Sequence, residues 1–298
     1  MLIDTNNNTY GKGPALKAAG VTDVIRYIAA GLVSNEKVIK PAEARYLAEQ
    51  GIGLGLVYEI GGRPSGAGVG QRDGNFAAAY AKTVGAPRDA VIWYTVDFDA
   101  SSIDYPGIAA AFKAFKRACA PDYRTGCYAS GYISDRLAAD GLIDNVSTDA
   151  PMDSTGGDSL IWLTDSLGFR GTRASVAGQR YIMLQGLPTT VAGLDADINK
   201  LHPGILRPDL SHAGTFIPFA DPQDPRVVSD PASVEGSVEW TQTMLNKHAP
   251  GYAGALLDVD GVLGPMTLKA IESFQRDHGL AVDGIVGPLT VDAIKGLA

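Results

Sequence analysis

The alternation of short apolar runs with helical patterns along the first ~200 residues constrains the fold more than any other feature of the sequence. Each run is bounded by Gly, Pro or Asp, as β-strands usually are. The eight runs are Met1 to Thr5, Val24 to Ala29, Gly53 to Glu59, Ala90 to Asp99, Gly126 to Ser130, Leu160 to Thr164, Tyr181 to Gln185 and Leu194 to Asn199.

The segments between the runs carry apolar residues at helical spacing, for example Ile108, Phe112 and Phe115. Strands that alternate with helices indicate βαβ units and a parallel sheet. Eight such strands in ~200 residues favour an α/β fold of the TIM-like (β/α)₈ barrel type. A doubly wound open sheet is the alternative, but no Gly-x-Gly-x-x-Gly follows the first run, so the usual fingerprint of nucleotide binding is missing.

The composition excludes several classes of function. Hydrophobic residues make up 45% of the 298 residues and charged residues 19%, which is enough apolar surface for a packed core. The net charge is −8 and the pI is near 5.0, without a basic stripe that would neutralise phosphates. Nucleic acid is therefore not an expected partner.

The N-terminal two-thirds shows no targeting segment. The longest apolar stretch, Ala90 to Val96, is far shorter than the ~20 residues that span a bilayer. Asp4 interrupts the N-terminus where a secretory signal would carry its apolar region. We expect neither a membrane span nor a signal peptide.

We expect Cys119 and Cys127 to be buried as small apolar side chains, with a single disulfide as the alternative.

The chain divides at a proline-rich segment. Residues 203–235 contain six prolines and no sustained apolar period, which predicts a linker between a domain of residues 1–202 and a domain of residues 236–298. The second domain holds an internal repeat, Asp260 to Thr267 and Asp283 to Thr290. In each copy Asp-Gly marks a turn and Pro stands where a helix starts, so Gly261 and Gly284 should have positive φ.

Carboxylates collect at the predicted strand ends. In the fourth run, period-2 geometry puts Asp97 and Asp99 on one face at its carboxyl end. Two like charges at this spacing shift each other's pKa, so that one carboxyl can act as an acid while the other stays ionised. The same reasoning adds Asp4 in the first run and Glu59 at the end of the third.

The last two runs add further polar residues at the same face. These are Asp195 and Asp197 in the eighth run and Gln185 at the end of the seventh. In a closed barrel the first and last strands are neighbours, so the acids should converge where barrel active sites lie. The alternative is that single Asp residues there only form turns or cap helices.

Carboxylates alone point to sugar chemistry. The four histidines occur from His202 onward, so no His of the first two hundred residues serves a Ser or Cys nucleophile or a zinc ion. No cofactor or metal is expected. Hydrolysis of a glycosidic bond needs only two carboxyl groups. Tyr58, Tyr128 and Trp162 lie near predicted strand ends and are candidates for stacking on sugar rings, with plain core packing as the alternative.

These residues carry a resemblance to known families. The Asp-Gly-x-x-Gly-Pro-x-Thr elements and the segment Phe274 to Leu280 resemble the small three-helix peptidoglycan-binding domain of wall hydrolases. Residues 1–201 resemble a glycoside-hydrolase-like barrel typified by a secreted mycobacterial cell-wall protein, which is itself similar to the family 25 muramidases. The muramidase pattern of Asp, Asp-x-Glu and Asp corresponds to Asp4, to Asp97 with Asp99, and to Asp195 or Asp197.

The resemblance implies an N-acetylmuramidase that acts on peptidoglycan, with Asp99 as the proton donor and Asp97 stabilising the transition state. Asp4 and Asp197 would orient the sugar or the attacking group. Asp99 is one methylene shorter than the family Glu, so Glu59 is a second candidate for the acid. A barrel joined to such a module looks like a phage endolysin of actinobacteria, made in the host cytoplasm and acting at the wall. A wall-binding protein without activity, and a glycosidase for another envelope polysaccharide, are the alternatives.

Overall fold

A computed structural model describes residues 1–29, 37–146, 159–202 and 238–297, apart from residues 249, 253, 255, 260–264, 281, 283, 285 and 287. The predicted linker, residues 203–235, lies outside the described residues, as does Gly261 of the first repeat copy.

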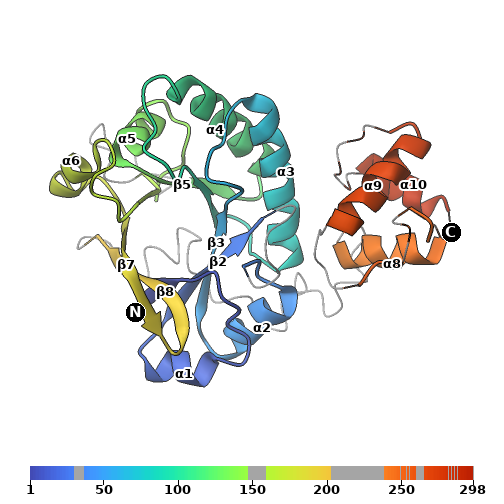
Figure 1. The fold of residues 1–298 in the computed structure, drawn as a ribbon, viewed down its shortest axis with the longest axis horizontal. Coiled ribbons are helices and arrows are strands. Elements are labelled where there is room, and N and C mark those ends of the chain that lie inside the picture. Colours follow the sequence, from blue (N-terminus) through green and yellow to red (C-terminus); the bar gives the residue numbers. More distant parts are fainter. Residues whose placement is uncertain are drawn as a thin grey trace.

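Eight strands form a closed barrel in chain order, which confirms the predicted barrel fold (Figure 1). Each strand overlaps the apolar run predicted for it. The strands are β1 (Leu2–Asp4), β2 (Asp23–Ile28), β3 (Gly53–Tyr58), β4 (Val91–Thr95), β5 (Arg124–Ala129), β6 (Ile161–Leu163), β7 (Met183–Val191) and β8 (Leu194–Leu201).

Helices cover the outside of the barrel (Figure 1). α4 buries Ile108, Phe112 and Phe115 against the sheet, as the helical spacing predicts. Cys119, at the end of α4, and Cys127, in β5, are both buried and not disulfide-bonded, so the disulfide alternative is wrong. The helices are α1 (Gly13–Ala18), α2 (Pro41–Glu49), α3 (Ala67–Thr83), α4 (Tyr105–Cys119), α5 (Gly131–Ala139) and α6 (Thr172–Ala177).

The last strand runs against the expected direction. β2 to β7 each lie parallel to the strand before, but β8 is antiparallel to both β7 and β1. β7 and β8 form a hairpin whose two turn residues, Ala192 and Gly193, have φ of 53° and 76°. Positive φ at both positions is the type I′ geometry that suits the twist of paired strands. The expectation of a parallel eighth strand is therefore wrong.

The C-terminal domain consists of α8 (Val238–His248), α9 (Pro265–Asp277) and α10 (Pro288–Lys295), which confirms the predicted helical domain. Its core includes Trp240, Leu245, Ile271, Phe274 and Ile294. Among the described helices, none combines the length and apolar character needed to cross a bilayer.

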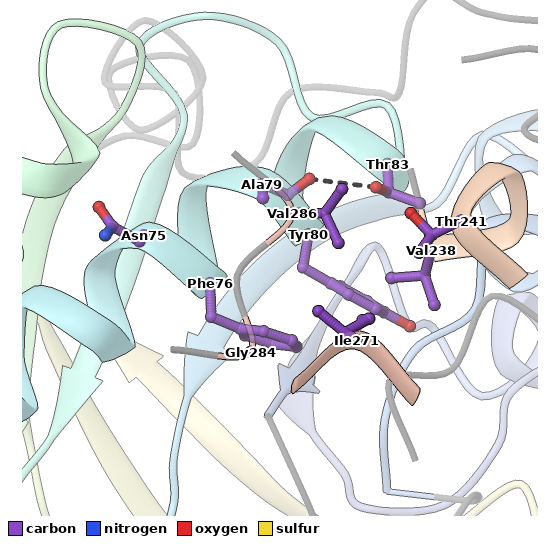
Figure 2. A pocket seen from close by; sticks show the side chains of 10 residues that line it. All are labelled: Asn75, Phe76, Ala79, Tyr80, Thr83, Val238, Thr241, Ile271, Gly284 and Val286. Carbon is purple, nitrogen blue, oxygen red and sulfur yellow. Dashed lines mark hydrogen bonds between the residues drawn. The ribbon is translucent and has the colours of Figure 1, made fainter. Parts of the chain in front are cut away.

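A groove lies between the C-terminal domain and α3 of the barrel (Figure 2). Phe76 and Tyr80 of α3 form one wall, and Ile271 and Val286 belong to the other. Tyr80 remains tied to the barrel, because its hydroxyl donates to Ile39 O at 2.8 Å. The lining residues place the small domain beside α3.

The second repeat glycine has the predicted conformation. Gly284 has φ of +68°, and its N–H donates to Gln275 Oε1 at 2.9 Å. A Cβ at this position would also meet Leu268 Cδ1. By contrast, Gly279 has φ of +65° with nothing within 4 Å of an added Cβ.

We expect Gly284→Ala to destabilise the C-terminal domain by more than the ~1 kcal/mol typical of a positive-φ glycine. The excess reflects the clash with Leu268. Chemical denaturation followed by the fluorescence of Trp240 measures the loss, and Gly279→Ala supplies the strain-only control. Equal losses in the two variants would contradict the packing argument.

Candidate functional site

A cavity of about 260 Å³ opens at the carboxyl ends of the parallel strands. Residues from seven of the eight strands or from the segments just after them line it. They are Tyr27, Val57, Glu59, Thr95, Asp97, Tyr128, Trp162, Asp165, Gln185, Pro188 and Asp197. The cavity lies at the end of the barrel where active sites of this architecture are built.

Four carboxylates line the cavity: Glu59, Asp97, Asp165 and Asp197. The first three lie just beyond the ends of β3, β4 and β6, and the fourth lies within β8. The sequence prediction included Glu59, Asp97 and Asp197 but missed Asp165. The signal for Asp165 was its position directly after the sixth apolar run.

Asp4 lies below the cavity, buried to 1% exposure, and is held by hydrogen bonds from two amide side chains. Asn199 Nδ2 donates to Asp4 Oδ2 at 2.7 Å, and Gln185 Nε2 donates to Asp4 Oδ1 at 3.3 Å. Gln185 Nε2 also reaches Asp197 Oδ2 at 3.2 Å, while Tyr128 Oη donates to Gln185 Oε1 at 2.6 Å. Gln185 therefore joins two acids to Tyr128, which forms the aromatic wall of the cavity together with Trp162.

The same hydrogen-bond network holds the aromatic wall of the cavity in place. Trp162 Nε1 donates to Asn199 Oδ1 at 2.8 Å. The rings of Tyr128 and Trp162 meet edge to face with centroids 4.8 Å apart. Tyr128, Trp162 and Gln185 thus lie at the cavity, where the sequence placed them.

Burial shifts the acids toward their protonated forms. Removal from water raises the pKa of Asp4 to about 7, with the nearby Asp197 charge adding to the shift. Burial also raises the pKa of Asp97, and the charges of Glu59 and Asp165 raise it further. The pKa of Asp197 is raised by burial and then by Asp165. Burial and mutual repulsion therefore favour the protonated forms of Asp97 and Asp197 in the cavity lining.

One cation lies among these acids. Lys37 Nζ is 3.0 Å from Glu59 Oε2 and 4.4 Å from the centroid of the Tyr27 ring. The ammonium group therefore pairs with Glu59 at the rim, and its charge lowers the pKa of Asp97 against the shifts above.

Asp99 does not join the cavity. β4 ends at Thr95, so the period-2 geometry that placed Asp97 and Asp99 on one face does not extend that far. Asp99 is 40% exposed and forms an ion pair with Arg170, with Asp99 Oδ2 3.0 Å from Arg170 Nη1. The predicted shared face of the two acids is wrong.

Two other predicted residues lie elsewhere. Tyr58 has 0% exposure in the layer between the sheet and the helices, where its hydroxyl donates to Asp73 Oδ1 at 3.2 Å. It is therefore a core residue and not a sugar platform. The side chain of Asp195 is exposed on β8, outside the cavity lining, and its backbone N–H donates to Asn7 Oδ1 at 2.9 Å.

Comparison with known families identifies the barrel. Residues 14–176 match the family described as Rv2525c-like, glycoside hydrolase-like domain. The chain belongs to this family. Residues 235–294 match a peptidoglycan binding domain, so an Rv2525c-like barrel is joined here to a module of the wall-binding type.

Solved structures support the fold of this Rv2525c-like barrel. Two crystal structures of the Tat-secreted protein Rv2525c of Mycobacterium tuberculosis, one in complex with HEPES and one with L-tartrate, match with a TM-score of 0.55 and 21% identity. Each match covers 67% of this chain and 94% of the other. A comparison with curated proteins gave no match.

The Rv2525c-like barrel holds Asp97 through a close contact with a glycine. Asp97 N–H donates to Gly62 O at 2.8 Å, and a Cβ at Gly62 would come within 2.7 Å of Asp97 Cβ. Gly62 has φ of +60°. Its neighbour Gly61 has φ of +65°, with nothing within 4 Å of an added Cβ.

We expect Gly62→Ala to displace Asp97, because the added Cβ would collide with Asp97 Cβ. Gly61→Ala carries the same backbone strain without the contact and should leave Asp97 in place. Carbon-13 NMR of the Asp97 carboxyl in both variants, at matched folded fractions, measures the difference. Equal chemical shifts in the two variants would show that this contact does not set the position of Asp97.

The buried acid gives the barrel a pH-dependent stability. Because the folded-state pKa of Asp4 is raised from 3.8 to about 7, the stabilisation linked to its proton is fully present below pH 3.8 and is lost as pH rises through about 7. Asp4→Asn stays neutral throughout, so it should be more stable than the wild type at pH 8, and this difference should shrink toward pH 4. Thermal melts across this range test the sign, with Asp195→Asn as an exposed control.

Proposed function

We propose that this protein hydrolyses glycosidic bonds in cell-wall glycan, as an N-acetylmuramidase-type glycosidase held on peptidoglycan by its C-terminal domain. The observation that carries the proposal is the cavity of the glycoside-hydrolase-like barrel, where four carboxylates meet an aromatic wall. Carboxyl groups whose environments differ are what acetal hydrolysis requires. The peptidoglycan-binding module supplies the substrate class.

Asp97 is the proton donor in this proposal. It lines the cavity, and burial with two neighbouring acids raises its pKa, which favours the protonated form that a general acid needs. Glu59 is less suited, because its carboxylate is engaged in an ion pair with Lys37 at 3.0 Å. The role that the sequence assigned to Asp99 therefore passes to Asp97.

Asp197 stabilises the positive charge that develops on the sugar. Its Oδ2 accepts from Gln185, whereas its Oδ1 is buried without a hydrogen-bond partner among the described residues. A buried oxygen of this kind is a costly feature unless a substrate or water approaches it. Gln185 donates to both Asp197 and Asp4 and so orients Asp197. Tyr128 and Trp162 offer the apolar surface on which a sugar ring packs.

The same arrangement fits a lytic enzyme acting at the wall, as an endolysin of a phage of actinobacteria does. In this role the C-terminal domain concentrates the barrel on its insoluble substrate, which raises the effective substrate concentration at the cavity. The proposal does not depend on any metal or cofactor. Among the described residues, no group of three or more His, Cys, Asp or Glu side chains is placed to hold a metal ion.

We expect Asp97→Asn to lose ~10²-fold or more of wall hydrolysis, because the amide cannot donate the proton of a carboxylic acid. Mass spectrometry of fragments released from purified sacculi measures the loss and identifies the new reducing end. Reducing-end muramic acid supports the muramidase proposal, whereas reducing-end glucosamine or another sugar would assign a different glycosidase.

Asp197 and Asp195 form a matched pair on β8 for the same assay. Asp197→Asn should lose hydrolysis and Asp195→Asn should keep it, since only the first lines the cavity. If the wild type pelleted with walls but released no fragments under any condition, the barrel would be a glycan-binding unit without activity.

A further inference from the structure

Two loops at the cavity are joined by an ion pair that no catalytic role accounts for. Arg170 N–H donates to Asp99 Oδ1 at 2.8 Å, and Arg170 Nη1 donates to Asp99 Oδ2 at 3.0 Å and to Asp99 O at 2.8 Å. The bonds connect the segment after β4 with the segment after β6. These strands are not neighbours, because β5 lies between them.

Each partner follows a cavity carboxylate along the chain. Asp99 comes shortly after Asp97, and Arg170 comes shortly after Asp165. The segment around Arg170 is itself fixed to the barrel, since Tyr132 N–H at the start of α5 donates to Arg170 O at 2.8 Å. The ion pair therefore connects the loop that carries Asp97 to a segment that is itself hydrogen-bonded to the start of α5.

Electrostatic repulsion opposes this arrangement. The carboxylates of Asp97 and Asp165 repel each other, and moving the two loops apart would relieve the repulsion. Contacts outside the cavity must hold the loops together. The charged or titratable groups that share the cavity with Asp97 are Glu59 after β3, Asp165 after β6, Asp197 on β8, Tyr27 on β2 and Tyr128 on β5, with Lys37 at the rim.

We propose that Asp99 and Arg170 form a clamp that holds Asp97 and Asp165 together at the cavity, and that both act as positioning residues for the proton donor. The inference rests on the proposed function for its catalytic consequence. Side chains 52% and 40% exposed contribute little to global stability as an ion pair, so the effect of the clamp is local.

The test uses Arg170→Gln in the full chain, with Arg170→Lys as the conservative variant. Arg88→Gln is the control, because Arg88 forms an exposed ion pair with Asp122 at 2.9 Å, outside the cavity lining. Loss of the clamp should lower kcat on cell walls ~10-fold with little change in KM. The pKa of Asp97 should move toward its ordinary value as Asp165 moves away and water enters. Because the proton donor then loses its proton at lower pH, the alkaline limb of the pH profile should move to lower pH. Arg170→Lys should restore both.

A carbon-13 NMR titration of the Asp97 carboxyl tests the clamp without an activity assay. The Asp97 signal is assigned by its loss in Asp97→Asn. A shifted titration in Arg170→Gln supports the clamp even if the wild type releases no wall fragments, in which case only the proposed hydrolysis fails. An unchanged titration and pH profile would overturn the clamp. A fall in melting temperature well beyond that of Arg88→Gln, with the Asp97 titration unchanged, would also overturn it by showing a purely structural role. If Arg170→Gln does not fold, Arg170→Lys decides the test. A titration of Asp97 in Arg170→Lys that differs from the wild-type titration then overturns the clamp.

Discussion

The barrel closes through β8, and the candidate site depends on the direction in which that strand runs. Because β8 is antiparallel to β1, Asp197 lies directly opposite Asp4. Residues that face each other across two strands have their Cβ atoms ~5 Å apart, close enough for one glutamine to contact both carboxyl groups. Reversal of the strand therefore brings its middle, rather than its end, to the cavity. The register of β8 against β1 therefore sets the spacing of the two acids.

The sequence predicted the strands well because strand signals are local. Apolar runs between turn residues mark all eight strands, and closure follows from their number. The direction of β8 was not predicted, although parallel strands need a connection of a dozen or more residues and the gap after Gln185 is shorter. Val191 to Leu194 instead complete a two-residue turn in which a non-glycine residue, Ala192, has positive φ. Composition alone gives such a turn no clear signature.

The site was predicted less well, for reasons visible in particular residues. Tyr58 was a candidate for the cavity because it lies near the end of its strand. β3 is buried on both faces, so no alternation shows which of its side chains face inward. Asp99 was assigned there by extending the strand period beyond Thr95. Asp165 was missed because it stands alone after a short strand, whereas Asp97 and Asp99 form a pair at the spacing of a strand. In each case side-chain direction depended on where a strand ended, which is the least reliable feature of a sequence reading.

Asp97 shows how a glycine in a neighbouring loop can set the position of a short acidic side chain. Gly62 lacks a Cβ, so its backbone approaches Asp97 closely enough to accept the Asp97 N–H at 2.8 Å. This contact holds a short acid at the cavity and covers one side of it with backbone. Reduced contact with water and the neighbouring charges then raise the pKa of Asp97. A glycine in the loop after β3 is therefore the sequence feature that lets a carboxyl group after β4 take this position at the cavity.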